Sequence, residues 1–282
     1  MNKKVFTAII TTCFFASAHA DSVGLYIGGQ LWQSNSSGKF GEQNSQTDNK
    51  LKNEQQFHYF VAVEHPFPVL PNIRIAKTAL DSQGNSQLTQ EYSADTDTAH
   101  VDVHVDSAIK ASFKVNYIDY TLYYQLLDNG LMSLDLGLTA RDFGGYVANS
   151  ATSTTVTTTR DFTWDGPEHD DHDYHNIVET VDSSSSKKFK TKDIEPMIYL
   201  ASEVQFPMPG LSLFIQGDLS FTGDHSIYDY QAGFNYDLVI SKAVDVSLSI
   251  GYRNVNLELE DLNNLYSDLE FKGAFVGVVT HF

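Results

Sequence analysis

The chain has 282 residues and carries 36 acidic against 18 basic side chains, a formal net charge of −18. This acidic excess argues against nucleic acid as a partner, because neutralising phosphates requires clustered lysine and arginine. The single cysteine, Cys13, lies within the first twenty residues. The remainder of the chain therefore has no side chain for a disulfide, a thiolate metal site or a cysteine nucleophile.

The first twenty residues have the pattern of a secretory signal peptide. Lys3 and Lys4 supply positive charge, an apolar run follows from Val5 to Phe15, and Ala18-His19-Ala20 is a small-x-small cleavage site. The apolar run is too short to span a bilayer. We expect residues 1–20 to be removed and residues 21–282 to form the mature domain.

Beyond this leader, apolar residues recur with period two, which places one set of side chains on each face of a strand. Because a transmembrane barrel needs only every second residue to be apolar, such segments can span a membrane without an 18-residue apolar run. We count ten of them, and in chain order they cover Val23–Leu31, Tyr59–Val63, Ile73–Ile75, Ile118–Leu126, Met132–Ala140, Ile194–Phe206, Leu211–Phe221, Tyr230–Ile240, Val244–Tyr252 and a last segment that ends at Phe282.

Short and long connections alternate between these segments. The short ones consist largely of turn-forming residues and cover 65–71, 128–130, 207–210 and 241–243. We expect large outside loops near 34–52, 83–112 and 142–189. Short inner turns, longer outer loops and an even strand count are typical of bacterial outer-membrane barrels. The predicted fold class is an all-β, closed antiparallel transmembrane β-barrel, with ten strands favoured over eight or twelve.

Two polar segments leave the strand number open. Residues 152–161 and 175–182 have strand-like sequences and could form a hairpin above the membrane or two more spanning strands. Both are too polar to contact lipid, which favours an extension of the barrel wall. Val101, Val103 and Val105 extend the fourth strand outward in the same way.

The chain ends in the sequence VGVVTHF, where an alternating apolar row finishes at Phe282. A terminal aromatic residue on such a strand is typical of proteins inserted into the bacterial outer membrane. We expect Phe282 to be an insertion signal recognised by the barrel-insertion machinery, after export through the periplasm.

Three segments resemble a family of uncharacterised outer-membrane β-barrel proteins of Gram-negative bacteria: VGLYIGGQLW, YFVAVEHPFPVLPNIRIA and GAFVGVVTHF. The resemblance covers essentially the whole mature chain. It implies a barrel fold and a location in the outer membrane. It brings no activity, cofactor or catalytic residue.

The inward positions of the predicted strands carry many charges. Ten strands enclose a narrow tube, and buried charges must be paired or hydrated. We expect a polar lumen in which carboxylates surround a few arginines and fix the barrel shape. A narrow cation-preferring channel is the second hypothesis, because acidic residues outnumber basic ones. The predicted network comprises Glu64, Arg74, Asp119, Asp135, Arg141, Glu203, Asp218, Asp237, Asp245 and Arg253.

Two further clusters suggest binding. The loop 168–175 is dense in His and Asp and could hold Zn²⁺, Ni²⁺ or Ca²⁺ weakly, but its spacing matches no closed metal site, so we predict no metal ligand. Lys187, Lys188, Lys190 and Lys192 could contact lipopolysaccharide phosphates where the sixth strand meets the outer leaflet, or could simply be solvated.

An enzyme is the less favoured alternative. Omptin proteases also use a ten-stranded barrel, with Asp pairs and an Asp–His pair at the outer rim. Asp81, Asp224-His225 and the run His100, Asp102, His104 offer similar residue types but no matching local motif, and there is no G-x-S-x-G sequence. We expect a structural, surface-binding or narrow solute-channel role; the alternative is a lipid- or peptide-hydrolysing enzyme with its site at the outer rim.

Overall fold

The computed structural model describes residues 23–43, 46–48, 50–96, 98–162, 174–220, 226–239, 244–262 and 264–282. The expected leader, the loop 168–173 and Asp224-His225 lie outside these residues. Within them, no helix has the length and hydropathy needed to cross a membrane.

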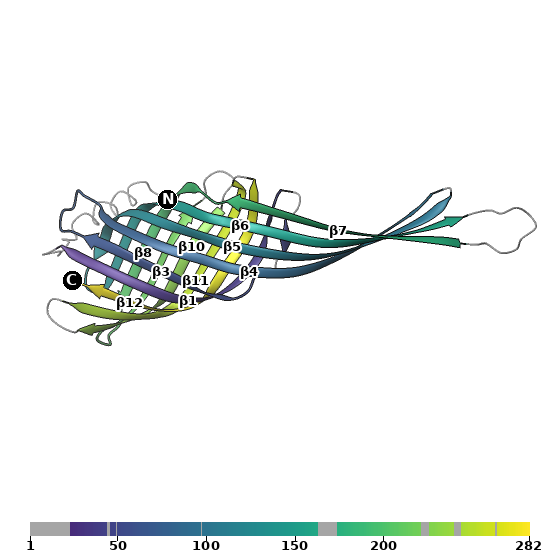
Figure 1. Cartoon of the computed structure of the whole chain (residues 1–282). Helices are drawn as coiled ribbons and strands as arrows, with labels where there is room; N and C mark the ends of the chain where they lie inside the picture. Colours follow the sequence, from purple (N-terminus) through teal and green to yellow (C-terminus); the bar gives the residue numbers. More distant parts are fainter. Residues whose placement is uncertain are drawn as a thin grey trace, which may run out of the picture.

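Ten antiparallel strands form a closed ring (Figure 1). Each pairs with its neighbours along the chain, and the last pairs back onto the first from Tyr26↔His281 to Gly41↔Tyr266. For the described residues, the expected count of ten is therefore confirmed. The ring strands are β1 (Gly24–Gly41), β3 (Glu54–Glu64), β4 (Asn72–Asp95), β5 (Ala99–Asp128), β6 (Met132–Phe162), β8 (Asp193–Gln205), β9 (Leu211–Ser220), β10 (Ser226–Val239), β11 (Asp245–Leu262) and β12 (Leu265–His281).

A band of exposed apolar side chains surrounds the barrel near the end that carries the short turns, which we call the inner end. Each strand contributes alternate residues to this band, as the period-two pattern predicts. Lipid is the solvent that accommodates such a surface, and ring closure leaves no unpaired edge inside it. The band includes Ile27, Leu31, Tyr59, Val61, Ile73, Ile75, Tyr120, Leu122, Leu136, Leu138, Ile198, Leu200, Leu213, Ile215, Phe234, Tyr236, Leu248, Ile250, Val276 and Val278.

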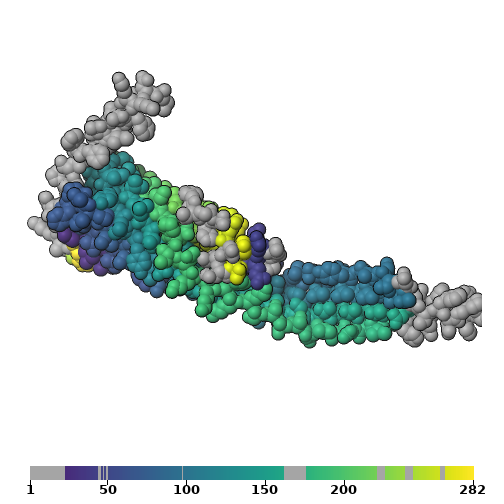
Figure 2. Space-filling view, turned by 90° about the horizontal axis from the view of Figure 1, so that it is seen from above, coloured from purple at the N-terminus to yellow at the C-terminus, as the bar shows by residue number. Residues whose placement is uncertain are grey.

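At the opposite, outer end, the segments 83–112 and 142–189 are strands over most of their length, where we expected loops. The outer parts of β4, β5 and β6 continue beyond the ring and are joined by β7 (Tyr174–Lys190), which in the described part of the chain pairs with β6 alone. We call this four-stranded projection the outer sheet (Figures 1 and 2). Segments 152–161 and 175–182 lie in it, so they extend the wall and do not span the membrane. Threonine and valine, common there, favour extended backbone.

The segment 34–52 also differs from the expected loop. Strand β1 continues to Gly41, and the short strand β2 (Thr47–Asp48) pairs with it at Lys39 and Phe40. An isolated bridge then joins Leu51 to Gly84 of β4. This connection is therefore paired with β1 at one point and with β4 at another, at the outer rim of the barrel.

The outer sheet leaves the ring at a glycine pair in β6. Strand β7 pairs with the outer part of β6 and β8 with its inner part, so the return strand is interrupted at Thr191 and Lys192. Opposite this break, Gly145 has φ +102°, and a Cβ there would lie 2.1 Å from the carbonyl oxygen of Lys114. The hydroxyl of Thr191 donates to the carbonyl of Gly144 at 3.0 Å. Glycine is required because an L side chain fits neither the conformation nor the space.

Candidate functional site

A fully buried charge cluster crosses the middle of the barrel. Asp229 of β10 is its hub and accepts hydrogen bonds from Arg253 at 2.7 and 2.8 Å, from Arg141 at 3.0 Å and from the Tyr117 hydroxyl at 2.8 Å. Each partner comes from a different strand. The cluster therefore ties opposite walls of the ring together through one carboxylate.

Arg141 also binds a second carboxylate. It donates to both oxygens of Asp119, its direct cross-strand partner, at 2.7 and 2.9 Å, and its guanidinium lies 3.9 Å from the ring centre of Tyr117. Two arginines thus share two aspartates. Such charge-assisted, two-point hydrogen bonds offset the cost of burying the charges only when the pairing is complete.

A second polar layer lies next to this cluster on its inner side. Arg74 contacts His58 at 3.2 Å, and the other ring nitrogen of His58 contacts the Thr78 hydroxyl at 2.8 Å. Asp218 accepts a 2.6 Å hydrogen bond from Thr139. These groups contact the charge cluster directly, since Arg253 donates to the Thr78 hydroxyl at 3.3 Å, and the void between the two layers is only about 10 Å³. The middle of the barrel is therefore closed.

Five of the ten predicted lumen residues meet in these layers: Arg74, Asp119, Arg141, Asp218 and Arg253. Sequence reasoning missed the hub, Asp229, and the buried His58. Counting in twos from the outward Tyr230 places Asp229 inside, so the signal was present in the alternation.

Toward the outer end, the barrel interior is apolar and not the polar lumen we expected. Phe113 lies between Phe40 and Phe271, with ring centres 6.4 and 5.1 Å apart. Outside the hydrocarbon both faces of the wall would meet water, so the side chains turned inward bury each other instead. This outer core includes Trp32, Phe40, Leu80, Phe113, Val115, Phe143, Val147, Val255, Leu257, Leu265, Leu269 and Phe271.

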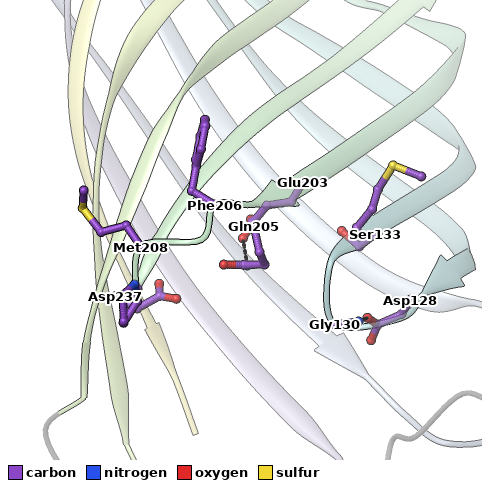
Figure 3. Close-up of a pocket in the computed structure, with 11 residues that line it drawn as sticks. Asp128, Gly130, Ser133, Glu203, Gln205, Phe206, Met208 and Asp237 are labelled. Atoms are coloured by element: carbon purple, nitrogen blue, oxygen red, sulfur yellow. Dashed lines mark hydrogen bonds between the residues drawn. The ribbon is translucent and has the colours of Figure 1, made fainter.

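Toward the inner end the barrel is hollow, with a cavity of about 540 Å³. The other five predicted lumen residues, Glu64, Asp135, Glu203, Asp237 and Asp245, line this inner cavity together with Asp128. Its mouth is a depression of about 350 Å³ beside the turn of Met208 and Gly210. Figure 3 shows the carboxylates of Glu203 and Asp237 there, with the 2.9 Å hydrogen bond from Gln205 to Glu203.

Neutral groups hold the cavity carboxylates in place. The Tyr123 hydroxyl donates to Glu64 at 2.8 Å, Asn235 to Glu203 at 3.1 Å, and Ser247 to Asp237 at 2.6 Å. Among the described residues, none of the six carboxylates forms an ion pair. The cavity wall therefore carries concentrated negative charge.

The outer sheet has one strongly polar face. Along β5, His100, Asp102, His104 and Asp106 alternate on this face. His100 contacts Asp95 through Nδ1 and Asp102 through Nε2 at 3.1 Å. His104 likewise contacts Glu91 at 3.2 Å and Asp106 at 3.1 Å. Each imidazole is thus held between two carboxylates, in what we call the histidine ladder.

Hydrogen bonds set the charge states in the histidine ladder. The bond to Asp95, with support from Asp102, raises the pKa of His100. A 2.8 Å hydrogen bond from Ser93 and the adjacent His100 lower the pKa of Asp102, and Thr89 and His104 lower that of Asp106. The ladder therefore favours charged carboxylates and a protonated His100.

The opposite face of the outer sheet is mostly apolar or hydroxylic. In the paired register, Tyr92, Val103, Thr157 and the charged Glu179 lie in one row, and Ala94, Val101, Thr159 and Ile177 in another. Tyr92 and Ile177 are more than half exposed. The sheet is a single amphipathic layer with both faces accessible.

The predicted lysines lie where β7 meets β8. Lys188, Lys190 and Lys192 alternate with the buried Phe189 and Thr191 and therefore face outward. Lys188 lies 3.7 Å from the ring centre of Tyr146, and Lys190 is the cross-strand partner of the same tyrosine. Lys187 points the other way and pairs with Glu42 at 2.6 Å.

The residues considered for catalysis form no catalytic arrangement in the described part of the chain. Both ring nitrogens of His100 and His104 contact carboxylates, which leaves neither free to activate a hydroxyl. Asp81 lies on the outward face of β4. Of the described residues, no three His, Cys, Asp or Glu are grouped so that they could hold a metal ion.

Comparison with known proteins yields distant structural likenesses. No family model and no curated protein matches the chain. The outer membrane protease OmpT of Escherichia coli is 12% identical, with 94% of this chain and 99% of that chain covered and a TM-score of 0.33. A Pseudomonas aeruginosa FadL homologue is 7% identical, with 93% and 90% covered and a TM-score of 0.31. Ail of Yersinia pestis is 10% identical, with 92% and 98% covered and a TM-score of 0.24. Likenesses of this degree carry no functional argument, and the barrel assignment rests on the closed ring of strands.

Proposed function

We propose that this protein is an integral outer-membrane β-barrel whose closed barrel anchors the outer sheet, and that the outer sheet binds a partner at the cell surface. The carrying observation is the continuous pairing of β4, β5, β6 and β7 beyond the ring. Residues 149–162 of β6 alone reach about 45 Å at ~3.3 Å per residue. The outer sheet thus places a large two-faced surface well clear of the membrane.

The filled interior supports binding over transport. The charge cluster and the outer core lie one after the other across the lumen, and their largest members are fully buried. An ion crossing the barrel would have to displace both layers. A narrow channel is therefore the weaker functional candidate.

Lipid contact at the outer rim fits the same anchoring role. Lys114, Tyr146 and Lys190 form one cross-strand row on the outward side, just beyond the half-buried Ile118 and the exposed Ile194. Ammonium groups at this height could bind lipopolysaccharide phosphates. We propose no catalytic role, because the described imidazole that contacts a hydroxyl, His58 beside Thr78, is buried in the closed middle of the barrel.

A register-matched truncation tests the proposal. Asn85, Lys110, Ser150 and Ser186 occupy one row across the four strands. Replacing 86–109 and 151–185 each with an Asn-Gly turn cuts all four strands of the outer sheet at the same level. Every strand pairing within the ring stays intact. Cells displaying either form would be compared for adhesion to immobilised matrix proteins, immobilised glycans and other cells.

We expect full-length cells to bind at least one of these surfaces and truncated cells to lose that binding, with equal amounts of heat-modifiable barrel in both. Equal adhesion by the two strains would contradict the proposal, as would no adhesion by the full-length strain. Steady conductance steps from the purified protein in planar bilayers would favour the channel instead.

A further inference from the structure

We propose that the inner cavity is a binding site for a small organic polycation, of the linear polyamine class, that enters from the periplasmic side. The site is independent of the outer sheet and of its proposed partner. It lies at the other end of the barrel, and the charge cluster separates the two.

The first argument is the unbalanced charge of the cavity. Its six carboxylates come from six different strands, so they surround the space rather than lining one side. The only arginine in the wall, Arg74, lies at the cavity floor, where it contacts His58 and lies 4.5 Å from the ring centre of Phe60. A cationic ligand would supply the charge that the wall lacks.

The second argument comes from buried polar atoms that have no partner. Gln231 is 6% exposed and Ser249 is 7% exposed, and both line the cavity. The side-chain oxygens of both residues have no hydrogen-bond partner among the described residues. Buried oxygens of this kind are normally satisfied. Here they are acceptors placed for N–H donors of a ligand.

Size and wall chemistry favour an organic cation over a metal ion. A cavity of about 540 Å³ is far larger than an ion requires and lies in the range of small-molecule sites. None of the described carboxylates are grouped tightly enough to hold a metal. Between them lie the rings of Tyr26, Tyr123, Tyr199 and Phe214, which attract ammonium groups and contact the methylene chain between them. A linear polyamine matches this wall, because its ammonium groups are separated by apolar methylene segments just as the carboxylates are separated by aromatic rings.

The test measures spermidine binding to the full mature chain, folded in a neutral detergent at physiological salt, by titration calorimetry. We expect one saturable site. Neutralising two wall carboxylates together, Asp135→Asn with Glu203→Gln, should weaken binding about a hundredfold, since each lost buried charge pair is worth about 1.4 kcal/mol or more, a factor of ten. The matched control is Glu91→Gln with Asp182→Asn, which removes the same charge from the outer sheet and should leave binding unchanged.

A second variant tests whether spermidine binding requires the space of the cavity and not only its negative charge. Ala201 lies on β8, the strand between β6 and β9, and lines the cavity. Ala201→Phe fills the space without altering charge and should also weaken spermidine binding about tenfold. A heat-dependent gel shift reports whether each variant is folded. The proposal is overturned if the wild type gives no saturable heat, if Ala201→Phe binds normally, if the control loses as much as the cavity variant, or if an equal concentration of magnesium displaces spermidine.

Discussion

Arg141 and Asp119 face each other directly across β5 and β6 and are joined by hydrogen bonds of 2.7 and 2.9 Å, with both side chains essentially without solvent exposure. The same guanidinium reaches Asp229 on the far wall. One arginine therefore contributes both to the pairing of adjacent strands and to a contact across the barrel, and its loss would leave a buried carboxylate uncompensated.

We predict that Arg141→Met destabilises the folded barrel by about 3–5 kcal/mol, because breaking a buried ion pair leaves the remaining charge in a medium that solvates it poorly. Urea unfolding in liposomes, followed by tryptophan fluorescence, measures the effect. The control Arg160→Met removes the solvent-exposed pair with Asp102 and should cost far less, because water screens that pair. Equal costs for the two variants would show that the cluster is not the stabilising element.

Truncation in the outer core should be costly as well. Phe271 is fully buried against Phe113, and Phe271→Ala removes an interior ring whose space cannot collapse, at about 3–5 kcal/mol. The exposed Tyr92→Ala on the outer sheet is the control and should change the unfolding free energy by much less. Since the charge cluster still closes the barrel, planar-bilayer recordings of Phe271→Ala should show no new conductance. If such steps did appear, the outer core would be the only barrier to ions.

The histidine ladder should give the outer sheet a pH-dependent stability. A raised His100 pKa contributes stability that is complete below the ordinary value near 6.5 and is lost as the pH rises through the raised value. The lowered pKa of Asp102 contributes stability present above its ordinary value of 3.8 and lost as the pH falls through the lowered one. Both contributions are complete between about pH 4 and pH 6.5.

Limited proteolysis or amide exchange of the outer sheet should therefore be slower at pH 5.5 than at pH 8.5. Asp95→Asn should lower the titration midpoint of His100, measured by proton NMR, toward the ordinary value. His100→Gln should abolish the difference between the two pH values. A His100 midpoint that did not change in Asp95→Asn would contradict the assignment.

Glycine in the wall should be required only where strands approach closely. A Cβ on Gly251 would lie 2.3 Å from the carbonyl oxygen of Ala232 and 2.7 Å from the ring of Phe275. We predict that Gly251→Ala sharply reduces the heat-modifiable fraction on refolding, because both neighbours are held by the barrel. At Gly29 nothing lies nearer than 3.8 Å, so Gly29→Ala is the control and should refold normally. Failure of both variants would point to backbone flexibility instead of close packing.

Phe282 should matter for insertion more than for stability. Its amide and carbonyl pair with Leu25 at 3.0 and 3.2 Å, whereas its ring is half exposed at the inner rim. Phe282→Ala keeps these backbone bonds. We expect refolding into liposomes at near wild-type yield but much less protein in the outer membrane of cells. A cellular yield equal to that of the wild type would remove the insertion-signal role.

The membrane-spanning part of the fold followed from the sequence because lipid on one side and the lumen on the other give each strand an unbroken period-two pattern. The outer core did not, because the phase of that pattern inverts toward the outer end of the longer strands. In β12, Val276 and Val278 face outward into lipid, whereas Leu269 and Phe271, closer to the outer end, face inward. Beyond the hydrocarbon region the outer surface of the barrel meets water, so the apolar side chains there point into the barrel.

The sequence predicted which charged side chains point into the barrel, but it did not predict which of them contact one another. Arg74, Arg141 and Arg253 lie inside, as counting in twos predicted. Which carboxylates they reach depends on strand stagger and barrel diameter, and these set the distance from Arg141 to Asp229 across the lumen. Similarly, nothing in the spacing of Glu64 and Asp135 indicated that these residues would line an open cavity instead of joining the cluster.

The departure of the outer sheet from the ring has a cost that the ring itself avoids. Once β4 and β7 leave the cylinder, each has a neighbouring strand on one side only among the described residues, so a line of backbone amides and carbonyls along either margin faces water. On the β7 margin, Glu179 and Asp182 are followed by four consecutive serines at 183–186, a sequence poorly suited to pairing with a foreign strand. The β7 margin is therefore a poor template for the addition of a strand from another molecule.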